Sequence, residues 1–409
     1  MIVYVGPLVT AAIKEQRRLP AFNPAGSNRL HRLAQALVAV DREVVCLAPG
    51  TALRMGWARR GWHRGRIVHQ QGVPTLFCRA VGMPVAGMLL APVFLILELW
   101  RLSRRRPIEA VLVYGCDPAA VFVASFARWG LRQPVILELE DIYVPRWSDW
   151  GADSEISGVR QAALWPCMKL MIALAQAFVV PTRRFLPQLK PHLPVEVVTG
   201  CMRVCPEPAE AFPVRPASPL HVLFAGRLEF EHGLRLLADA VDVLERSSAP
   251  RPIEFDVCGQ GSKEAWFRQR VAGWRRVVVR CHGFLPEVDY RALLAQADVC
   301  LALQHPAGRE AQANVPSKAY EFMCSGKATV VTRVGDLAEL PAAMCLLLEP
   351  YTPEALASEL QGLSPPRARE LGQAARAYAL AHWDLAPVGQ RLCGLLARSR
   401  AVVPQRHGS

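Results

Sequence analysis

Short apolar runs alternate with longer amphipathic runs along the first 180 residues. The apolar runs hold three to five residues rich in Val, Ile and Leu, which is typical of strands buried on both faces. They occupy 2–5, 43–47, 110–114, 135–139 and 178–180. The segments 28–39, 119–129 and 159–177 repeat apolar residues at helical spacing. This alternation predicts a parallel sheet wrapped by helices.

The alternation stops at 201–219, where five prolines exclude regular structure, and then restarts. Strands are predicted at 221–225, 254–258, 277–281, 299–303 and 329–332, with helices at 234–246, 263–272, 287–296 and 318–324. We therefore predict an α/β chain of two doubly wound, Rossmann-like domains, 1–200 and 220–384, joined by a linker at 201–219. Such domains bind ligands where the strand order reverses, so we expect them to face a ligand cleft.

The final segment, 371–400, is strongly helical, and Pro387 is expected to interrupt it. A helix of this kind must pack against a core. The tail that follows, VVPQRHGS, is expected to be disordered.

The charge of the 409-residue chain is unevenly distributed. Hydrophobic residues make up 52% and charged residues 20%, which excludes a disordered or fibrous protein. Residues 1–200 contain 24 Lys and Arg against 13 Asp and Glu, so they account for +11 of the net charge of +13. The first half is thus expected to meet an anionic partner or surface.

The longest apolar stretch, 84–97, has 14 residues and precedes a cluster of arginines. Spanning a bilayer takes about 20 residues, so its length favours a core helix. The surrounding segment 51–106 nevertheless contains ten arginines and one acid, Glu98. This charge favours peripheral contact with an anionic membrane over a purely structural role. Nucleic acid is not expected as a partner, because no nucleic-acid motif accompanies the arginines.

The twelve cysteines form no CxxC pair, and no histidine pair has the spacing of a zinc site. They are expected to be small buried side chains in a reducing compartment. Met1 to Val5 already forms a strand-like run with no basic region before it. We therefore expect a cytoplasmic protein that is peripheral at the inner membrane face.

Two turns in the second half are candidates for phosphate binding. One predicted strand ends in Gly226 and Arg227, a placement that suits a phosphate oxygen. The next strand is followed by Gly259 and Gly261, a tight turn that could face a nucleotide. Each is a weak signal alone, since many strands end in an arginine or a plain turn.

The segment PSKAYEFMCSGK is more informative. Pro316 and Ser317 are expected to open a short helix that Gly326 closes, with Ser317 as its cap. The N-terminus of such a helix binds phosphate. Lys318 and Glu321 share one face of the helix. The alternative is a solvated ion pair, but we favour a role in ligand binding because both residues lie at the expected ligand edge.

The order of these motifs resembles the nucleotide-sugar domain of glycosyltransferase family 4, which has the two-domain GT-B fold. The resemblance rests on strand–Gly–Arg, then G-x-G, then Gly283, then P-S-K-x-x-E-F-M-x-x-G-K-x-x-V-x-T. The sequence His382-Trp383-Asp384 also resembles the family's break before a last helix, here 385–400, which crosses back to the first domain. The resemblance is specific over roughly 220–385 and diffuse over 1–200.

The resemblance implies roles for matching residues. Arg227 is expected to bind the donor pyrophosphate, Glu321 the ribose, and the backbone from Val315 to Lys318 the phosphates. The full donor-binding set is Gly6, Arg227, His232, Gly259, Gly261, Asn314, Val315, Pro316, Ser317, Lys318 and Glu321.

The sequence departs from the family pattern at two positions. His232 stands where the family usually has a lysine, and Ala313 where it often has a second glutamate. A histidine is a weaker, pH-dependent cation. These departures keep open the hypothesis of a GT-B subunit that has kept the fold and lost the chemistry.

Three carboxylates of the first domain are candidate catalytic residues. Glu140 and Asp141 follow one predicted strand, and Asp117 follows another. Carboxylates at strand ends suit hydroxyl recognition or base assistance. The alternatives are helix caps or, for the adjacent pair, a salt bridge to Arg146.

The resemblance implies a retaining transferase that moves a sugar from a nucleotide-sugar donor to a glycan or lipid-linked acceptor, in bacterial-type surface polysaccharide synthesis. It implies no cofactor and no metal, because side-chain cations and a helix N-terminus stabilise the leaving diphosphate. Two other hypotheses stay open: a sugar-nucleotide epimerase of the same fold, and a non-catalytic GT-B subunit.

Overall fold

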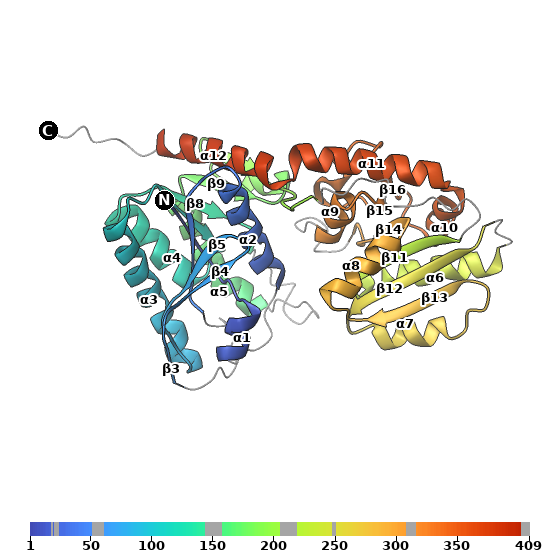
Figure 1. The fold of residues 1–409 in the computed structure, drawn as a ribbon, viewed down its shortest axis with the longest axis horizontal. Helices are drawn as coiled ribbons and strands as arrows, with labels where there is room; N and C mark the ends of the chain where they lie inside the picture. Colours follow the sequence, from blue (N-terminus) through green and yellow to red (C-terminus); the bar gives the residue numbers. More distant parts are fainter. Residues whose placement is uncertain are drawn as a thin grey trace. The chain divides into compact units, whose positions relative to one another are not determined.

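The computed structural model describes residues 1–17, 19, 24–50, 61–143, 158–204, 219–247, 251–307 and 316–401. The chain divides into two compact units, and each is an α/β unit built on its own sheet (Figure 1). Unit 1 comprises Met1–Cys201 and Leu385–Ser409, and unit 2 comprises Met202–Asp384. Most of the predicted linker lies outside the described residues.

Unit 1 contains an eight-stranded sheet in the order β10-β9-β8-β7-β1-β2-β5-β4. Its strands are β1 (Ile2–Val5), β2 (Val44–Ala48), β4 (Arg66–Gln70), β5 (Val73–Phe77), β7 (Ala110–Tyr114), β8 (Val135–Glu138), β9 (Ala177–Val180) and β10 (Val195–Val197). Adjacent strands are parallel except that β4 runs antiparallel to β5. The strand order reverses between β1 and β7, so the carboxyl ends of these two strands mark a switch point.

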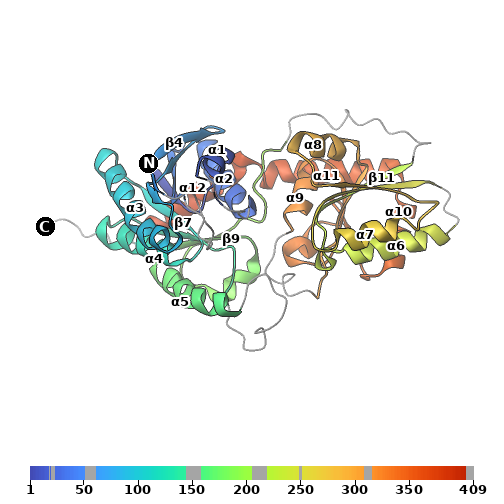
Figure 2. The same ribbon diagram turned by 90° about the horizontal axis from the view of Figure 1, so that it is seen from below.

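Helices cover both faces of this sheet (Figures 1 and 2). They are α1 (Ala11–Arg17), α2 (Pro24–Val38), α3 (Pro84–Arg105), α4 (Pro118–Ser125), α5 (Gly158–Leu174) and α12 (Leu385–Ala401), with a π-turn, η1 (Phe126–Gly130), after α4. One core contains Leu99, Val123 and Met171 from α3, α4 and α5. The other contains Leu33 of α2 and Leu392 of α12. Burial on both faces explains the continuous apolar strands.

Unit 2 contains a six-stranded parallel sheet in the order β13-β12-β11-β14-β15-β16. Its strands are β11 (Leu220–Arg227), β12 (Ile253–Gln260), β13 (Val278–Gly283), β14 (Val299–Ala302), β15 (Ala328–Val331) and β16 (Leu346–Leu347). Its helices are α6 (Leu234–Arg246), α7 (Glu264–Val271), α8 (Glu287–Gln296), α9 (Ser317–Cys324), α10 (Pro353–Gly362) and α11 (Pro365–His382). The strand order reverses between β11 and β14.

The sequence pattern predicts unit 2 better than unit 1. The predicted helices 234–246 and 287–296 have the bounds that the structure shows. In the unit 1 sheet the pattern misses β4, β5 and β10. Strand β4 (RIVHQ) is largely exposed and lacks an apolar run. The helix expected at 28–39 begins earlier, at Pro24, so Asn28 lies inside it rather than at its start.

Of two helix breaks expected near the C-terminus, one is wrong and one is confirmed. The break expected at Pro387 is wrong, because α12 begins at Leu385 and places this proline in its first turn, where proline costs no hydrogen bond. The break at Trp383 and Asp384, expected from the family resemblance, is confirmed. Asp384 accepts a hydrogen bond from the Val204 backbone amide (3.0 Å), which ties the break to the chain after Cys201.

Helix α3 differs from the expectation drawn from the apolar stretch 84–97. The helix has 22 residues rather than 14, because the arginine-containing segment after Leu97 continues it. Only 22% of its most apolar stretch is buried in the structure. The interpretation of this stretch as a core helix is therefore wrong for the side of the helix that is exposed to solvent.

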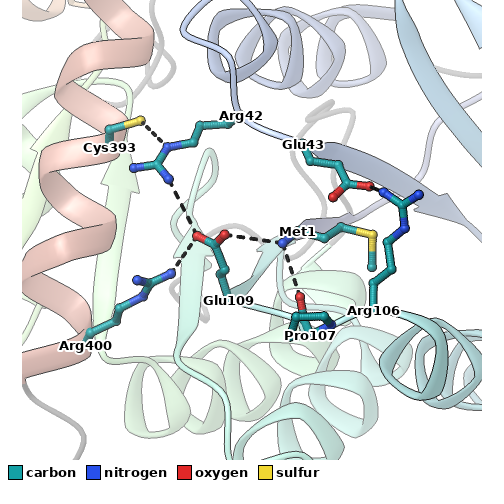
Figure 3. A network of polar contacts seen from close by, with 8 residues as sticks. All are labelled: Met1, Arg42, Glu43, Arg106, Pro107, Glu109, Cys393 and Arg400. Atoms are coloured by element: carbon teal, nitrogen blue, oxygen red, sulfur yellow. Dashed lines mark hydrogen bonds and ion pairs between the residues drawn. The ribbon is translucent and has the colours of Figure 1, made fainter.

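Helix α12 is joined to unit 1 by close packing and by a polar network. A Cβ placed on Gly389 would lie 2.0 Å from the Ala36 carbonyl oxygen, so α12 meets the α2 backbone at a glycine. At the far end, Glu109 accepts from Arg400 (2.6 Å) and from the amino terminus of Met1 (3.3 Å), as Figure 3 shows. Arg106 pairs with Glu43 in the same region.

We expect Gly389→Ala to lower the free energy of unfolding by about 1–3 kcal/mol, because the new methyl group would force α12 away from α2. The matched control is Gly394→Ala in the same helix, whose Cβ would meet only the flexible Arg398 side chain at 3.5 Å. That control should gain roughly 0.5–1 kcal/mol from helix propensity. Urea unfolding of both variants measures the difference, and equal stabilities would contradict this packing.

Candidate active site

The carboxyl ends of β11 and β12 meet through glycines. A Cβ on Gly259 would lie 1.7 Å from the Gly226 carbonyl oxygen, and one on Gly261 would lie 2.3 Å from that of Leu228. Gly226 and Gly259 adopt φ angles of +148° and +138°. Close strand packing and these φ angles therefore explain why glycine is needed at these positions. Arg227, the last residue of β11, is exposed.

The start of α9 lies against this strand end. The Lys318 Cγ atom is 3.9 Å from the Cβ position at Gly226. Lys318 Nζ lies 2.9 Å from Glu321 Oε2 and 4.0 Å from the centre of the Tyr290 ring. Both charged side chains are about one-third exposed, so the pair is open to solvent on one side. The prediction that Lys318 and Glu321 share one face of α9 is confirmed, and the ion pair that they form is the alternative that the sequence left open.

Tyr290, on α8, is a member of this cluster that sequence reasoning missed. Its side chain is buried. Burial and the negative charge of Glu321 raise the pKa of Tyr290, so its hydroxyl stays protonated. The sequence offers no motif for this residue, because only the fold brings α8 beside α9.

The helix start itself differs from the expectation. Ser317 is the first helical residue of α9, and Pro316 occupies the cap position without a side-chain hydrogen bond. The expectation that Ser317 caps the helix is therefore wrong. Gly326 follows the helix with a φ of +69°, as expected for a terminating glycine. Asn314 and Val315 lie outside the described residues.

The loop after β11 is held close to the end of β14. Gly233 has a φ of +90°, and a Cβ there would lie 2.2 Å from the Leu303 carbonyl oxygen. His232 immediately precedes it in a short 3₁₀ turn and is partly exposed. The Glu229 carboxylate accepts from the Ser262 amide (2.5 Å) and hydroxyl (2.7 Å), which binds this loop to the one after β12. Arg227, His232 and Lys318 thus all lie along the carboxyl edge of the unit 2 sheet.

A second polar cluster lies at the switch point of unit 1. A Cβ on Gly6 would lie 2.9 Å from the Cβ atom of Tyr114, and one on Gly26 would lie 2.2 Å from the Tyr114 hydroxyl. The Tyr114 hydroxyl donates to Glu140. Burial and the Glu140 charge raise the pKa of Tyr114, so it remains a donor. The structure therefore brings together Gly6 and Glu140, and adds Tyr114 and Gly26, which sequence reasoning missed.

Glu138, at the end of β8, forms a buried ion pair beneath this cluster. Its carboxylate is fully buried, accepts from Arg29 Nε (2.8 Å) and accepts from the Tyr4 hydroxyl. Arg29 also donates to the Val198 carbonyl oxygen (2.9 Å). Burial raises the pKa of Glu138 to about 7, and the Arg29 guanidinium opposes the rise. Sequence reasoning missed Glu138, because it lies inside an apolar strand.

The other two predicted carboxylates, Asp117 and Asp141, have hydrogen-bond partners of their own. Asp117 caps α4, where its carboxylate accepts from the Ala120 amide (2.9 Å), and burial raises its pKa. The cap was the alternative that the sequence left open. Asp141 accepts from the Tyr143 hydroxyl (3.4 Å). Arg146, its other candidate partner, lies outside the described residues.

Neither switch point presents a metal-binding cluster: within the described segments, no three His, Cys, Asp or Glu side chains are grouped as metal ligands would be. The eleven cysteines in those segments are all free, and eight are buried. The absence of a metal requirement remains a prediction.

Comparison with known proteins identifies the family. The model described as "Glycosyl transferase 4-like domain" matches residues 25–191, and the model described as "Glycosyl transferases group 1" matches residues 219–364. The chain belongs to the family 4-like glycosyltransferases. No curated protein matches this glycosyltransferase at a significant level.

Solved structures share the GT-B fold with this glycosyltransferase over nearly its whole length. A sucrose-phosphate synthase from Thermosynechococcus elongatus is 16% identical, with 98% of this chain and 99% of that chain covered and a TM-score of 0.63. A trehalose-6-phosphate synthase is 12% identical (97% and 99% covered, TM-score 0.64). The lipopolysaccharide outer core galactosyltransferase WaaB is 11% identical (97% and 99% covered, TM-score 0.61). At these identities the likeness establishes the fold alone.

We expect Glu138→Gln to change how stability depends on pH. With a pKa of about 7, folded Glu138 keeps its proton over a pH window in which the unfolded chain, with its ordinary value of 4.5, has released it. Because folding takes up a proton in this window, the contribution of Glu138 to the free energy of unfolding falls as pH rises from about 4.5 to 7. The contact with Arg29 is therefore a full ion pair only above about pH 7, and a hydrogen bond to the neutral acid below it.

The difference in unfolding free energy, wild type minus Glu138→Gln, should therefore decrease by up to about 3 kcal/mol between pH 4.5 and 7.5 and then stay constant. Urea unfolding at several pH values measures it. A difference that is flat or rises with pH would mean that Arg29 keeps the carboxylate charged throughout.

Proposed function

We propose that this glycosyltransferase moves a sugar from a nucleotide-sugar donor, held by unit 2, to an acceptor held by unit 1, with retention of anomeric configuration. The observation that supports the donor assignment is the grouping of Arg227, Lys318 and Glu321 at the carboxyl edge of the sheet, where the strand order reverses between β11 and β14. Two cations and one carboxylate at such a point suit a diphosphate and a ribose.

The chemistry proposed for unit 2 is electrostatic. Negative charge grows on the diphosphate as the bond to the sugar breaks, and cations already in place stabilise it. Arg227 extends from the end of β11, and Lys318 lies in the first turn of α9, whose N-terminus carries partial positive charge. The Glu321 carboxylate is the group that would accept hydrogen bonds from the ribose hydroxyls. His232 would add a cation only when protonated.

The acceptor is assigned to the switch point of unit 1. There Glu140 is the partly exposed carboxylate, and the Tyr114 hydroxyl holds it in place. A carboxylate so fixed can accept a hydrogen bond from an acceptor hydroxyl and orient it for attack. The buried ion pair of Glu138 and Arg29 supports this cluster from below.

Solved relatives of the same fold support a donor and an acceptor of these classes. One, from E. coli, is described as bound with UDP-2-fluoro glucose, and one, from Burkholderia xenovorans, as a complex with glucose-6-phosphate. We extend the proposal to a glycan or lipid-linked acceptor, used in surface polysaccharide synthesis, and to a cytoplasmic enzyme at the inner membrane face. The basic excess of residues 1–200 supports the location.

We expect one nucleotide among UDP, GDP, ADP and CMP to raise the melting temperature. A ligand at a hundredfold excess over its dissociation constant stabilises the native state by about 2.7 kcal/mol. Arg227→Ala and Glu321→Ala should each abolish most of the shift, because they remove the contacts to diphosphate and ribose.

Arg291→Ala is the matched control, since Arg291 is an exposed arginine of unit 2 that pairs with Glu287 of its own helix. It should leave the shift unchanged. A shift that survives in both site variants, or no shift with any nucleotide, would refute the donor-site assignment.

A further inference from the structure

Helix α3 exposes an apolar stripe along its outer side. The stripe consists of Val85, Leu89, Val93, Leu97 and Trp100, and we call it the α3 outer face. Steps of four, four, four and three residues place these side chains on one side of a helix. Leu89 is 65% exposed. The opposite side, by contrast, contributes Leu95 and Leu99 to the core.

Neighbouring elements also expose aromatic side chains. Trp62 of β3 (Trp62–His63) is 72% exposed and contacts Phe94 of α3 edge to face, with ring centres 6.0 Å apart. Helix α4 packs beside α3 and exposes Phe122, and η1 exposes Trp129. Exposed aromatic residues around an apolar stripe are typical of a surface that meets the interface between lipid and water.

The charges around this surface are positive. The segments 84–105, 118–130 and 158–174 contain six Lys and Arg and one acid, Glu98. That acid is paired with Arg101. Arg104 and Arg105 are exposed at the end of α3, and the Arg104 guanidinium lies 5.7 Å from the centre of the Trp100 ring. Arg106 is instead paired with Glu43 (Figure 3).

We propose that the α3 outer face inserts into the headgroup region of an anionic lipid bilayer, with α3 lying in the membrane plane and Arg104 and Arg105 on the lipid phosphates. Apolar insertion combined with electrostatic attraction is the usual basis of interfacial binding. This deepens the proposed location at the inner membrane face by naming the surface and the mode of binding, and it rests on the proposed function in that a bound membrane would present a lipid-linked acceptor to unit 1.

The topology of unit 1 determines that α3 lies on the membrane rather than across it. By length and composition, Val85–Arg105 could cross a bilayer. However, β5 precedes α3 and β7 follows it, and both belong to the same sheet. A crossing helix would place them on opposite sides of the membrane. The folded sheet therefore confines α3 to one side.

Charge favours lipid over a second copy of the chain as the occupant. A symmetric dimer through this surface would bring the same arginines of both copies together, with Glu98 as the one acid in the three segments to offset them. Anionic headgroups complement the same arginines.

Co-sedimentation with vesicles of phosphatidylglycerol and phosphatidylethanolamine tests the proposal. The triple variant Leu89→Glu, Val93→Glu, Trp100→Glu should lower the fraction bound by at least about tenfold, because it removes the inserted apolar groups. Arg104→Glu with Arg105→Glu should weaken binding at low salt and to anionic vesicles in particular. The matched control is Val288→Glu in unit 2, which replaces a side chain that is 77% exposed and should bind as the wild type does.

Unchanged binding of the triple variant, or no binding of the wild type to any vesicle, would overturn the proposal. A wild-type dimer that the triple variant converts to a monomer, by light scattering, would also overturn it and identify a subunit interface instead. The nucleotide-induced melting shift of each variant is measured in parallel. A variant that loses vesicle binding but keeps the nucleotide-induced melting shift has a defect in the membrane surface alone. A wild-type protein without that shift would contradict the donor-site assignment and not the membrane surface.

Discussion

In the main sheet of each unit the strand order reverses between two adjacent parallel strands, and this constraint decides where the functional groups can lie. The connections that follow the two strands at the reversal run in opposite directions. They leave a crevice at the carboxyl ends of these strands, where a ligand can bind. In unit 2 the reversal separates β11 from β14, and in unit 1 it separates β1 from β7. The polar clusters of Lys318 with Glu321 and of Tyr114 with Glu140 lie at these two points.

Glycines bring the backbone close enough for these clusters to form. Gly226 and Gly259 pack strand ends together in unit 2, while Gly26 leaves room for the Tyr114 hydroxyl in unit 1. The two clusters differ in charge balance as their proposed ligands do. Unit 2 presents cations suited to a diphosphate, and unit 1 presents carboxylates suited to hydroxyls. The buried Glu138 and Arg29 pair then fixes α2 against the sheet of unit 1.

Sequence reasoning recovers what depends on local pattern and misses what depends on tertiary contact. Five of the six described strands of unit 2 and its helices α6 to α9 follow from periodicity, and the shared face of Lys318 and Glu321 follows from helical spacing. Tyr290 and Glu138 have no local signal, because their roles arise from neighbours distant in the chain. The exposed side of α3 was also unpredictable, since an apolar sequence does not show which of its side chains a core will cover.

The measurement that tests the account most directly is amide hydrogen exchange across the whole chain, with and without the nucleotide that gives the largest melting shift. Nucleotide binding is expected to slow exchange in 226–233, which covers the end of β11 and the loop after it, and in 317–324, which forms α9. Exchange in unit 1 near Tyr114 should be unchanged by nucleotide alone. Protection confined to unit 1, or to parts of unit 2 away from the reversal of strand order, would contradict the placement of the donor site at the β11–β14 reversal.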